Sequence, residues 1–407
     1  MRRISGASPA GLLVALMLPA AASALSLELK PSAHAEVRND DNIFRAPDQP
    51  GVGAAPKLSD TLTQYGAGAR LTLRHSLQSV EFRGEYDHVD YASQDQLDHD
   101  RYRLAGDAKL AYGSNWGVEL KAERQRRLEN FAFRDDTQPG FVRLDTASAE
   151  LHYDLTPRWT ASAKADRYAS RASLLSSQDY DLTETGVEIG GQYRRNGYSS
   201  LGLFLRQVQG EFPNRVVVAG DGREKDYDQR SLIVRAGYTP SGLSDLAAQL
   251  GYTQRRHDQV GVDDFSGLTG RLGYTRRLSG RTRLKAEVYR DLFYVEEVNA
   301  NYVENLGLSF SADYLYSAKL SFAAALERVQ SDYGGSSGIA GGVGIGEQRS
   351  DDLLSLSLGA DYRPFYRFSV LPEYRYERRG SNALNSDYAF GTIGVDFLYQ
   401  YGARLGD

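Results

Sequence analysis

The chain has 407 residues, no cysteine and a formal net charge of −5 at pH 7. The lack of cysteine excludes a disulfide framework, a thiolate metal site and a cysteine nucleophile. Basic residues are interleaved with acidic ones and form no tract, so no nucleic-acid partner is expected.

The first residues have the features of a secretory signal peptide. Two arginines precede an apolar run over residues 11–22, which is followed by a small-residue cleavage site. We expect residues 1–24 to be removed and residues 25–407 to form a single transmembrane domain. The alternative is an uncleaved anchor helix, which is disfavoured because the run is too short to span a bilayer and contains Pro19.

Beyond the signal, apolar and polar residues alternate in segments of about a dozen residues. Residues 117–123 and 282–288 are clear examples, with Val, Leu or Ala at every second position and Glu, Lys or Arg between them. This pattern gives each strand one face for lipid and one for water, and it predicts a transmembrane β-barrel. The alternative is a soluble β-sandwich, which is disfavoured because Ala and Gly are common on the apolar faces.

Short and long connectors alternate along the chain, as they do when a barrel has a turn side and a loop side. Short ones such as 196–197 are expected in the periplasm, and long ones such as 131–140 and 212–225 outside the cell. The prediction is an all-β, antiparallel outer-membrane β-barrel with an aqueous lumen and about 18 strands. The expected strands are 33–44, 60–74, 77–91, 99–112, 116–130, 141–154, 158–171, 180–194, 198–211, 226–239, 244–258, 264–276, 281–296, 300–315, 317–331, 351–363, 366–379 and 386–401.

Two prolines disturb the pattern. Pro31 is expected to set the start of the first strand near Ala33, and Pro372 is expected to cause a bulge or bend in the seventeenth. Proline has these effects because it lacks a backbone donor for the ladder. If either segment failed to pair, the barrel would have about 16 strands.

Aromatic residues flank both kinds of connector, which predicts two belts, one at each membrane interface. The belt beside the short connectors includes Tyr112, Trp116 and Trp159. The belt beside the long connectors comprises Phe44, Tyr102, Phe131, Phe141, Tyr180, Tyr227, Phe265, Tyr302, Tyr333 and Tyr388.

The polar face of each strand should line the lumen and decide what passes. By parity, the candidate lumen-lining residues are Arg70, Glu81, Arg83, Glu85, Lys109, Glu119, Lys121, Glu123, Asp166, Arg283, Lys285, Glu287, Glu373 and Arg375. Both signs occur on single strands, which suits hydroxyl-rich or zwitterionic cargo better than a strongly ion-selective path. The alternative is that these groups pair across strands and only solvate the wall.

Catalytic and metal-binding patterns are weak, and we expect neither an enzyme nor a cofactor. Residues 334–338 match G-x-S-x-G, but they lie in a Gly/Ser-rich loop and not on a strand-to-helix turn. The six histidines have no metal-ligand spacing. His152 with Ser148 or Ser162 leaves open a lipase-like site on the barrel wall.

The segment 35–45 ends in Asp41-Asn42-Ile43-Phe44-Arg45. It resembles the first-strand motif of the β-barrel porin type 2 family, which includes outer-membrane proteins of exopolysaccharide biosynthesis operons. The resemblance implies polysaccharide cargo and a partnership with a periplasmic or outer-membrane polysaccharide export protein. It supplies no catalytic residue. One departure is that the chain continues after Tyr401, whereas many outer-membrane barrels end on an aromatic residue.

The motif also has a direct physical interpretation. Asp40, Asp41 and Asn42 are expected at the outer rim, where they either bind a hard cation with loop oxygens or cap the loop through backbone hydrogen bonds. Ile43 and Phe44 are expected to pack against lipid or a neighbouring loop.

These observations lead to three hypotheses for a barrel in the outer-membrane lipid of a Gram-negative bacterium. The first is a conduit for a secreted exopolysaccharide. The alternative is a general diffusion porin for small solutes. The least favoured is an outer-membrane lipid hydrolase or a structural barrel.

Overall fold

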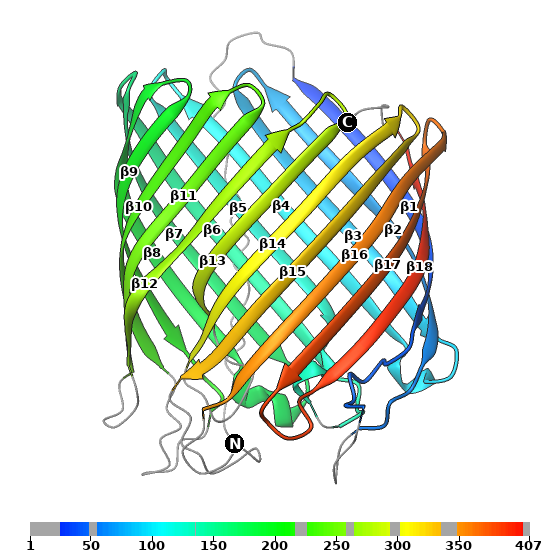
Figure 1. Cartoon of the computed structure of the whole chain (residues 1–407). Helices are drawn as coiled ribbons and strands as arrows, with labels where there is room; N and C mark the ends of the chain where they lie inside the picture. Colours follow the sequence, from blue (N-terminus) through cyan, green and yellow to red (C-terminus); the bar gives the residue numbers. More distant parts are fainter. Residues whose placement is uncertain are drawn as a thin grey trace, which may run out of the picture.

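The computed structural model describes residues 25–48, 55–134, 136–215, 226–257, 264–293, 302–334 and 348–401. They form one 18-stranded antiparallel sheet, which closes because β1 pairs with both β2 and β18 (Figure 1). The predicted all-β barrel and its count of 18 strands are therefore confirmed. Closure gives the backbone of every strand partners on both sides, which hydrocarbon cannot supply. The predicted signal peptide lies outside the described residues.

Each strand is antiparallel to the next along the chain. Within the described residues, three short 3-10 helices lie in loop-side connectors: η1 (Asp95–Leu97), η2 (Phe131–Phe133) and η3 (Leu175–Tyr180). No described helix is long and apolar enough to cross a membrane. The strands are β1 (Ser26–Asp40), β2 (Asp60–His75), β3 (Gln78–Tyr91), β4 (His99–Tyr112), β5 (Trp116–Leu128), β6 (Phe141–Thr156), β7 (Trp159–Ala172), β8 (Leu182–Asn196), β9 (Ser199–Glu211), β10 (Tyr227–Ser241), β11 (Ser244–His257), β12 (Phe265–Arg277), β13 (Thr282–Phe293), β14 (Tyr302–Ser317), β15 (Leu320–Gly334), β16 (Ser350–Phe365), β17 (Phe368–Ser381) and β18 (Tyr388–Gln400).

The first strand starts earlier than predicted, because Pro31 does not interrupt it. β1 pairs with β2 from Ser26 onward, whereas its pairing with β18 begins only at Ser32. The Pro31 carbonyl oxygen accepts a hydrogen bond from the Tyr401 backbone N–H at 2.9 Å, on the β18 side. A residue's N–H and C=O point to the same side of an antiparallel strand, so the missing donor of Pro31 takes nothing from the β2 ladder.

Pro372 interrupts one ladder without shifting its register. It stays in register with Val395 of β18, but pairing with β16 stops after Gly359–Glu373 and resumes at Tyr362–Val370. Of the predicted bulge or bend, the bulge is therefore absent at this proline. The register shift of this pair lies nearer the turn, between Tyr362 and Phe365.

The turn-side aromatic belt agrees with the prediction. Tyr112, Trp116, Trp159 and Tyr238 are exposed on the outer wall near the short turns, and Tyr198 is exposed in the β8–β9 turn. An aromatic ring is stable at this level because its apolar body meets acyl chains and its polar edge meets water.

The predicted loop-side belt is mostly wrong. Six of its members are buried and face inward: Phe44, Phe131, Tyr227, Phe265, Tyr333 and Tyr388. They belong to inward-folded connectors or to the inner face at strand ends, where they pack against each other and against arginines. Proximity to a loop in sequence does not distinguish a ring facing lipid from one facing the mouth of the barrel.

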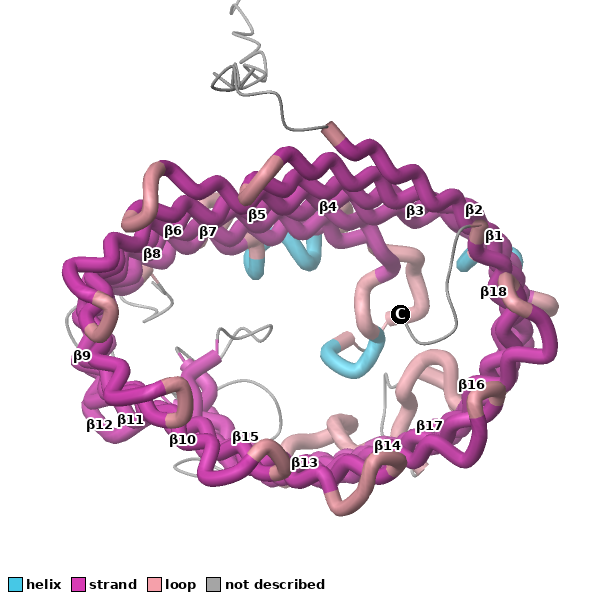
Figure 2. The backbone as a smooth tube through the Cα atoms, turned by 90° about the horizontal axis from the view of Figure 1, so that it is seen from above, coloured by secondary structure: helices cyan, strands magenta, loops and turns pink. Residues whose placement is uncertain are grey.

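The barrel is an elongated ring when viewed along its axis, and loop-side connectors project into its interior (Figure 2). A small hydrophobic cluster forms there from Ile43, Phe44, Ala55, Leu97 and Phe131. Because the residues come from several connectors, the mouth has a packed core of its own.

Candidate functional site

The strand register separates an apolar face from a charged face of the wall. On β13, Leu284 and Val288 are exposed and apolar, whereas Lys285 and Glu287 occupy the opposite parity and lie 3.3 Å apart. This alternation is the one that the sequence predicts for a strand between lipid and water.

The charged face borders the lumen. One cavity of about 540 Å³ is lined by residues from Arg83 on β3 to Gln249 on β11. Residues on strands so far apart around the sheet can border one space only from inside the barrel. The candidate functional site is therefore this lumen, together with the connectors that fold into its mouth.

All the predicted lumen-lining residues share the parity of this face. They lie on β2 (Arg70), β3 (Glu81, Arg83, Glu85), β4 (Lys109), β5 (Glu119, Lys121, Glu123), β7 (Asp166), β13 (Arg283, Lys285, Glu287) and β17 (Glu373, Arg375). Most form ion pairs across or along strands, such as Arg83–Asp107 at 3.3 Å and Lys109–Glu119 at 3.9 Å. Within the described part of the chain, only Glu85, Arg283 and Glu373 of this set lack one. Pairing across strands therefore describes most of these residues, and a role in passage remains a prediction.

One wall of the lumen is rich in paired cations. Arg206 donates to both Asp166 carboxylate oxygens at 2.7 and 2.8 Å, and Arg235 donates to both oxygens of Glu188 at 2.7 Å. Lys164, on the same wall, has no carboxylate partner among the described residues. Bidentate pairs hold the guanidinium groups in fixed positions along this wall.

The opposite wall is acidic. A cavity of about 500 Å³ beside β14–β18 and β1 is lined by small residues together with Glu36, Arg38, Asp313, Asp361, Glu373 and Asp396. Asp313, Glu373 and Asp396 form no ion pair with any described residue. Figure 2 shows the strands of the two walls on opposite sides of the ring. Charges arranged in this way produce a field across the lumen, which orients solutes that carry both signs.

The motif residues 41–45 lie in a connector and not in the first strand, because β1 ends at Asp40. Asn42 is fully buried, and its Nδ2 donates to the carbonyl oxygens of Ala46 at 2.8 Å and Ala389 at 3.0 Å. Its Oδ1 accepts from the Ala46 N–H at 2.9 Å. Asn42 thus attaches the β1–β2 connector to β18.

The acidic residues of the motif also hold the connector in place, because they accept hydrogen bonds from backbone N–H groups. Asp40 accepts from the backbone N–H of Asn42 at 2.9 Å, and Asp41 accepts from that of Gly391 at 2.8 Å. The described residues contain no group of three His, Cys, Asp or Glu side chains that could hold a metal ion. Of the two predicted roles, loop capping is the one that these contacts show.

Arg45 is the last residue of the motif, and its backbone conformation is strained. Its φ of 55° lies in the left-handed region, which is unfavourable for a side chain with a Cβ. Two hydrogen bonds to Asp40, at 2.9 and 2.8 Å, offset the strain, and the guanidinium carbon lies 3.5 Å from the centre of the Phe390 ring. The strain is compatible with a firmly held turn.

Ile43 and Phe44 pack against neighbouring connectors, not against lipid. The Phe44 ring meets Phe131 of η2 edge to face, with centroids 5.0 Å apart, and Leu97 of η1 completes the contact. The β1–β2, β3–β4 and β5–β6 connectors are thereby joined in the mouth.

The β5–β6 connector reaches a distant part of the wall. Arg379 of β17 donates to the Ala132 carbonyl oxygen at 2.5 Å and stacks on Tyr388, and Ala132 packs with Tyr388 and Phe390 of β18. β5 is separated from β18 in the sheet by β1, β2, β3 and β4. The connector therefore crosses part of the mouth and narrows it (Figure 2).

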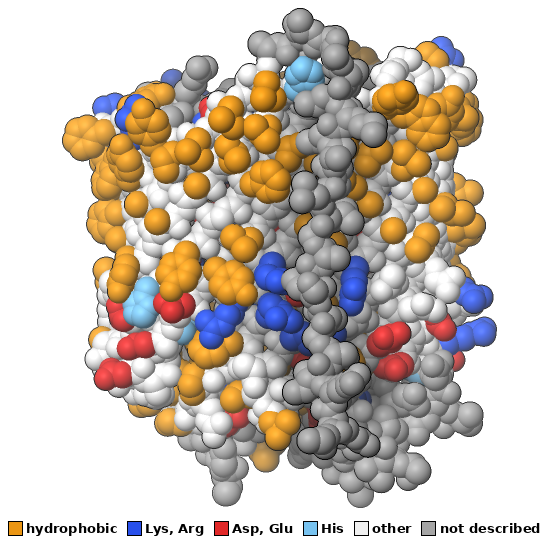
Figure 3. Space-filling model, turned by 180° about the vertical axis from the view of Figure 1, so that it is seen from behind, with side chains coloured by type: hydrophobic (Ala, Val, Ile, Leu, Met, Phe, Trp, Pro, Cys, Tyr) orange, Lys and Arg blue, Asp and Glu red, His pale blue; other side chains and the backbone are white. Residues whose placement is uncertain are grey.

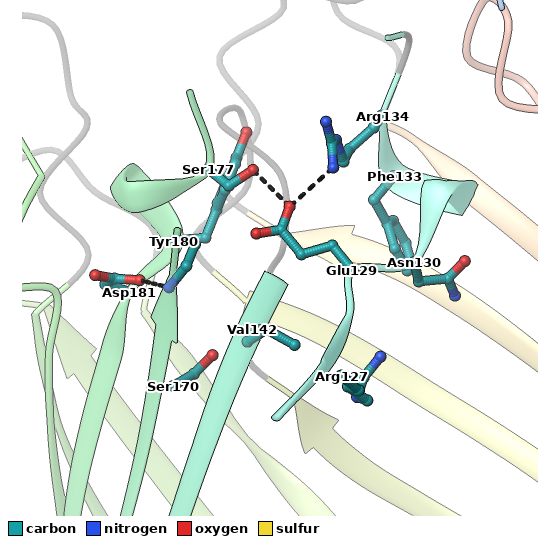
Figure 4. A pocket seen from close by; sticks show the side chains of 11 residues that line it. Arg127, Glu129, Asn130, Phe133, Arg134, Val142, Ser170, Ser177, Tyr180 and Asp181 are labelled. Carbon is teal, nitrogen blue, oxygen red and sulfur yellow. Dashed lines mark hydrogen bonds and ion pairs between the residues drawn. The ribbon is translucent and has the colours of Figure 1, made fainter. Parts of the chain in front are cut away.

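A further contact joins the β5–β6 and β7–β8 connectors around a cavity of about 60 Å³ (Figure 4). Glu129 accepts from Ser177 at 2.8 Å and from Arg134 at 3.1 Å. Burial raises the pKa of the Glu129 carboxyl, and the hydrogen bond from Ser177 and the charge of Arg134 oppose that effect without cancelling it. Asp181 extends the chain of contacts, since it accepts from Asn214 of the β9–β10 connector at 2.6 Å.

Sequence reasoning missed the residues that hold the connectors, namely Glu129, Ala132 and Arg379. Arg379 has the same parity as Glu373 and Arg375, so its inward orientation could have been predicted. Its partner Ala132 lies 247 positions away in the chain. No local pattern marks that contact.

The lipase-like alternative receives little support from the geometry. His152 and Ser162 are directly opposed on β6 and β7. Among the described residues, no hydrogen bond joins His152 to Ser162 or Ser148. Ser336 of the G-x-S-x-G segment lies outside the described residues.

Comparisons with protein-family models and with curated proteins gave no match. Solved structures do match. The chain is similar to OccK2 (OpdF) of Pseudomonas aeruginosa, with 15% identity and a TM-score of 0.50 over 92% of this chain and 98% of that one. It is also similar to OccK9 (OpdG) of the same organism, with 14% identity and a TM-score of 0.50 over 92% of this chain and 98% of that one. The outer membrane protein OpdK of Pseudomonas aeruginosa matches with 13% identity and a TM-score of 0.47 over 92% of this chain and 99% of that one.

At these identities the likeness is one of fold. The shared fold is that of porin-type barrels in the Gram-negative outer membrane, and this chain is an outer-membrane barrel of the same type. The resemblance to the exopolysaccharide-associated family gains nothing from these matches and depends on segment 35–45 alone.

Proposed function

We propose that this protein is a passive channel through which small hydrophilic solutes cross the outer membrane. The observation that carries the proposal is a closed barrel whose lumen is lined by charges of both signs and whose mouth is narrowed by packed connectors. This is the second of the hypotheses drawn from the sequence.

The mouth favours small solutes over a polymer. The β5–β6 connector is held by contacts to two other parts of the barrel, Glu129 with Ser177 of η3 and Ala132 with Arg379 of β17. Moving it aside would leave buried polar groups without partners, at a cost of about 1–3 kcal/mol for each. A sliding polysaccharide requires a continuous wide path, whereas a small solute can pass beside the connector.

The lumen favours solutes that are polar or carry both charges. The paired cations near Lys164 face the acidic wall near Asp313. Such walls exchange hydrogen bonds with a solute without retaining it, as conduction requires. No step of the proposal involves catalysis.

An exopolysaccharide conduit is the second candidate function. It would require a polysaccharide cargo and a polysaccharide export protein as partner. It is favoured by the resemblance of Asp41-Asn42-Ile43-Phe44-Arg45 to the family motif. Those residues fasten a connector in this barrel, which is a role that either function could use.

Flux through the purified barrel in liposomes tests the proposal directly. We expect rapid entry of monosaccharides and amino acids and exclusion of long oligosaccharides. Glucuronate, which OccK2 binds in a solved complex, is a suitable anionic probe. Equal passage of long and short sugars would contradict the proposal.

Deletion of the gene separates the two candidates. A small-solute channel predicts reduced solute permeability with normal surface polysaccharide. Loss of surface polysaccharide with unchanged solute uptake would establish the conduit instead.

A further inference from the structure

A row of arginines crosses the outer surface of the barrel. Arg126, Arg143 and Arg171 occupy directly opposed positions on β5, β6 and β7, on the lipid-facing side of the wall. Opposed residues have Cβ atoms about 4.5–5.5 Å apart, a distance at which like charges destabilise a sheet. Figure 3 shows basic side chains gathered on this face toward the loop side, below the apolar band.

Arg124 and Arg167 extend the row toward the membrane centre. Each lies eight residues beyond the turn-side tryptophan of its strand, Trp116 or Trp159, or about 20 Å along the membrane normal for a tilted strand. The apolar band of a barrel is about 25 Å tall, so these arginines lie near its outer edge. At the same distance from Tyr314 on β14, the outward residue is Leu306.

The cluster has fewer carboxylates than guanidinium groups. Asp145 accepts from Arg124 at 2.5 Å and lies 3.3 Å from Arg143. Among the described residues, no carboxylate lies within ion-pair distance of Arg126, Arg167 or Arg171.

Arg230, Arg256 and Arg378 also point outward on the loop side and form no ion pair with a described residue. Other outward arginines there are neutralised individually. Arg290 is paired with Glu304 at 2.7 Å, and Arg328 is paired with Asp352. A one-to-one pair is the economical way to keep an arginine near hydrocarbon.

The β5–β7 cluster lacks that one-to-one arrangement. Arg126 and Arg171 donate to uncharged oxygens, the carbonyls of Asp100, Ser170 and Leu182 and the hydroxyl of Thr183, so no carboxylate neutralises their charge.

An apolar groove adjoins the cluster. It has a volume of about 1000 Å³ and is lined on the outer wall by Leu71, Phe82, Leu104 and a series of Ala and Gly residues, with Arg124 and Arg167 also in the lining. Small side chains let a ligand approach the backbone closely. A groove lined in this way, with cations beside it, suits a molecule with acyl chains and a phosphorylated headgroup.

We propose that the outward arginines of β5, β6 and β7 bind the phosphate groups of a phosphorylated glycolipid in the outer leaflet, whose acyl chains lie in the adjoining groove. Guanidinium groups match phosphate oxygens in bidentate geometry, and this pairing is strong where water is scarce. The anion would also relieve the repulsion between Arg126, Arg143 and Arg171.

The test uses the full mature barrel in detergent and a bis-phosphorylated, acylated glucosamine disaccharide as the probe, measured by native mass spectrometry. We expect Arg126→Gln, Arg143→Gln and Arg167→Gln together to weaken its binding by at least about tenfold. Removing the phosphates from the lipid should have the same effect on the native protein. Inorganic phosphate should not compete, because it lacks the acyl chains.

The matched control removes three cations from the lumen face of the same region, with Lys109→Gln, Lys121→Gln and Lys164→Gln. It should bind the glycolipid as the native protein does. Unchanged solute flux through the arginine variant would show that the barrel has folded. The proposal is overturned if that variant retains the lipid, if the dephosphorylated lipid binds equally well, or if the cluster instead holds a second copy of the barrel in a lipid-independent dimer.

Discussion

Asn42 shows what one side chain does for this barrel. It is fully buried and bonds three backbone groups, of which two belong to its own connector and one to β18. An amide is suited to this position because it donates and accepts at once without carrying a charge. The family-like motif therefore has a structural reason that is independent of what passes through the lumen.

Replacing Asn42 should loosen the β1–β2 connector. Asn42→Ala leaves the Ala46 N–H and the Ala389 carbonyl oxygen without partners, which should cost about 1–3 kcal/mol. Faster hydrogen exchange over residues 41–46 would reveal the loss. Asn39→Ala, which removes an exposed amide from the end of the same strand, is the control. Equal exchange in the two variants would contradict the role given to Asn42.

Unpaired carboxylates on the acidic wall should set the ion preference. Asp313→Asn with Glu373→Gln removes two lumen charges that have no ion pair among the described residues. The cation-to-anion permeability ratio should fall about twofold, because the local field weakens. Reversal potentials in planar bilayers measure the ratio. Asp352→Asn, on the outer face, should leave it unchanged, and a shift with the control alone would refute the assignment.

Connectors are the elements whose position the sequence did not reveal. Phe131 and Phe44 were expected near the membrane interface and instead meet each other inside the mouth. Strand parity fails at the end of a strand, since a connector can turn either outward or inward. The contact with a distant wall decides between the two.

Releasing the β5–β6 connector should widen the mouth. Phe131→Ala with Arg379→Gln removes its apolar anchor and its bond to β17. Single-channel conductance should then rise by about twofold, because the narrowest section limits the current. Leu175→Ala, an exposed change in η3, is the control. A conductance equal to that of the native barrel would show that the connector does not limit passage.

The stability of the barrel should depend on pH through Glu129, which lies in the same connector. Its pKa is raised in the folded protein, so its contribution to stability is complete below the ordinary glutamate pKa and is lost as pH rises through the raised value. Glu129→Gln should therefore gain thermal stability relative to the native protein as pH increases from about 4 to about 7. Asp136→Asn, which alters a more exposed partner of Arg134, should show a smaller trend. A trend of the opposite sign for Glu129→Gln would disprove the assignment.

At the scale of the molecule, the barrel depends on a strict separation of its two faces. Leu308→Lys would place a charge on the lipid face and should cost about 2–4 kcal/mol near the membrane centre. Ser309→Lys, one residue away, faces the lumen opposite Glu287 and should cost far less. Reversible unfolding from lipid vesicles measures both changes. Equal costs would mean that the faces are wrongly assigned.

The sequence alone determined the strand count, the closed antiparallel sheet and the parity of residues such as Glu119 and Glu287. It could do so because a period of two is a local property of the chain, and each strand must present an apolar face to lipid and a polar face to water. It did not determine where the connectors lie or that Arg126, Arg143 and Arg171 are directly opposed. Those features depend on contacts between residues far apart in the chain, and only closure of the barrel brings such residues together.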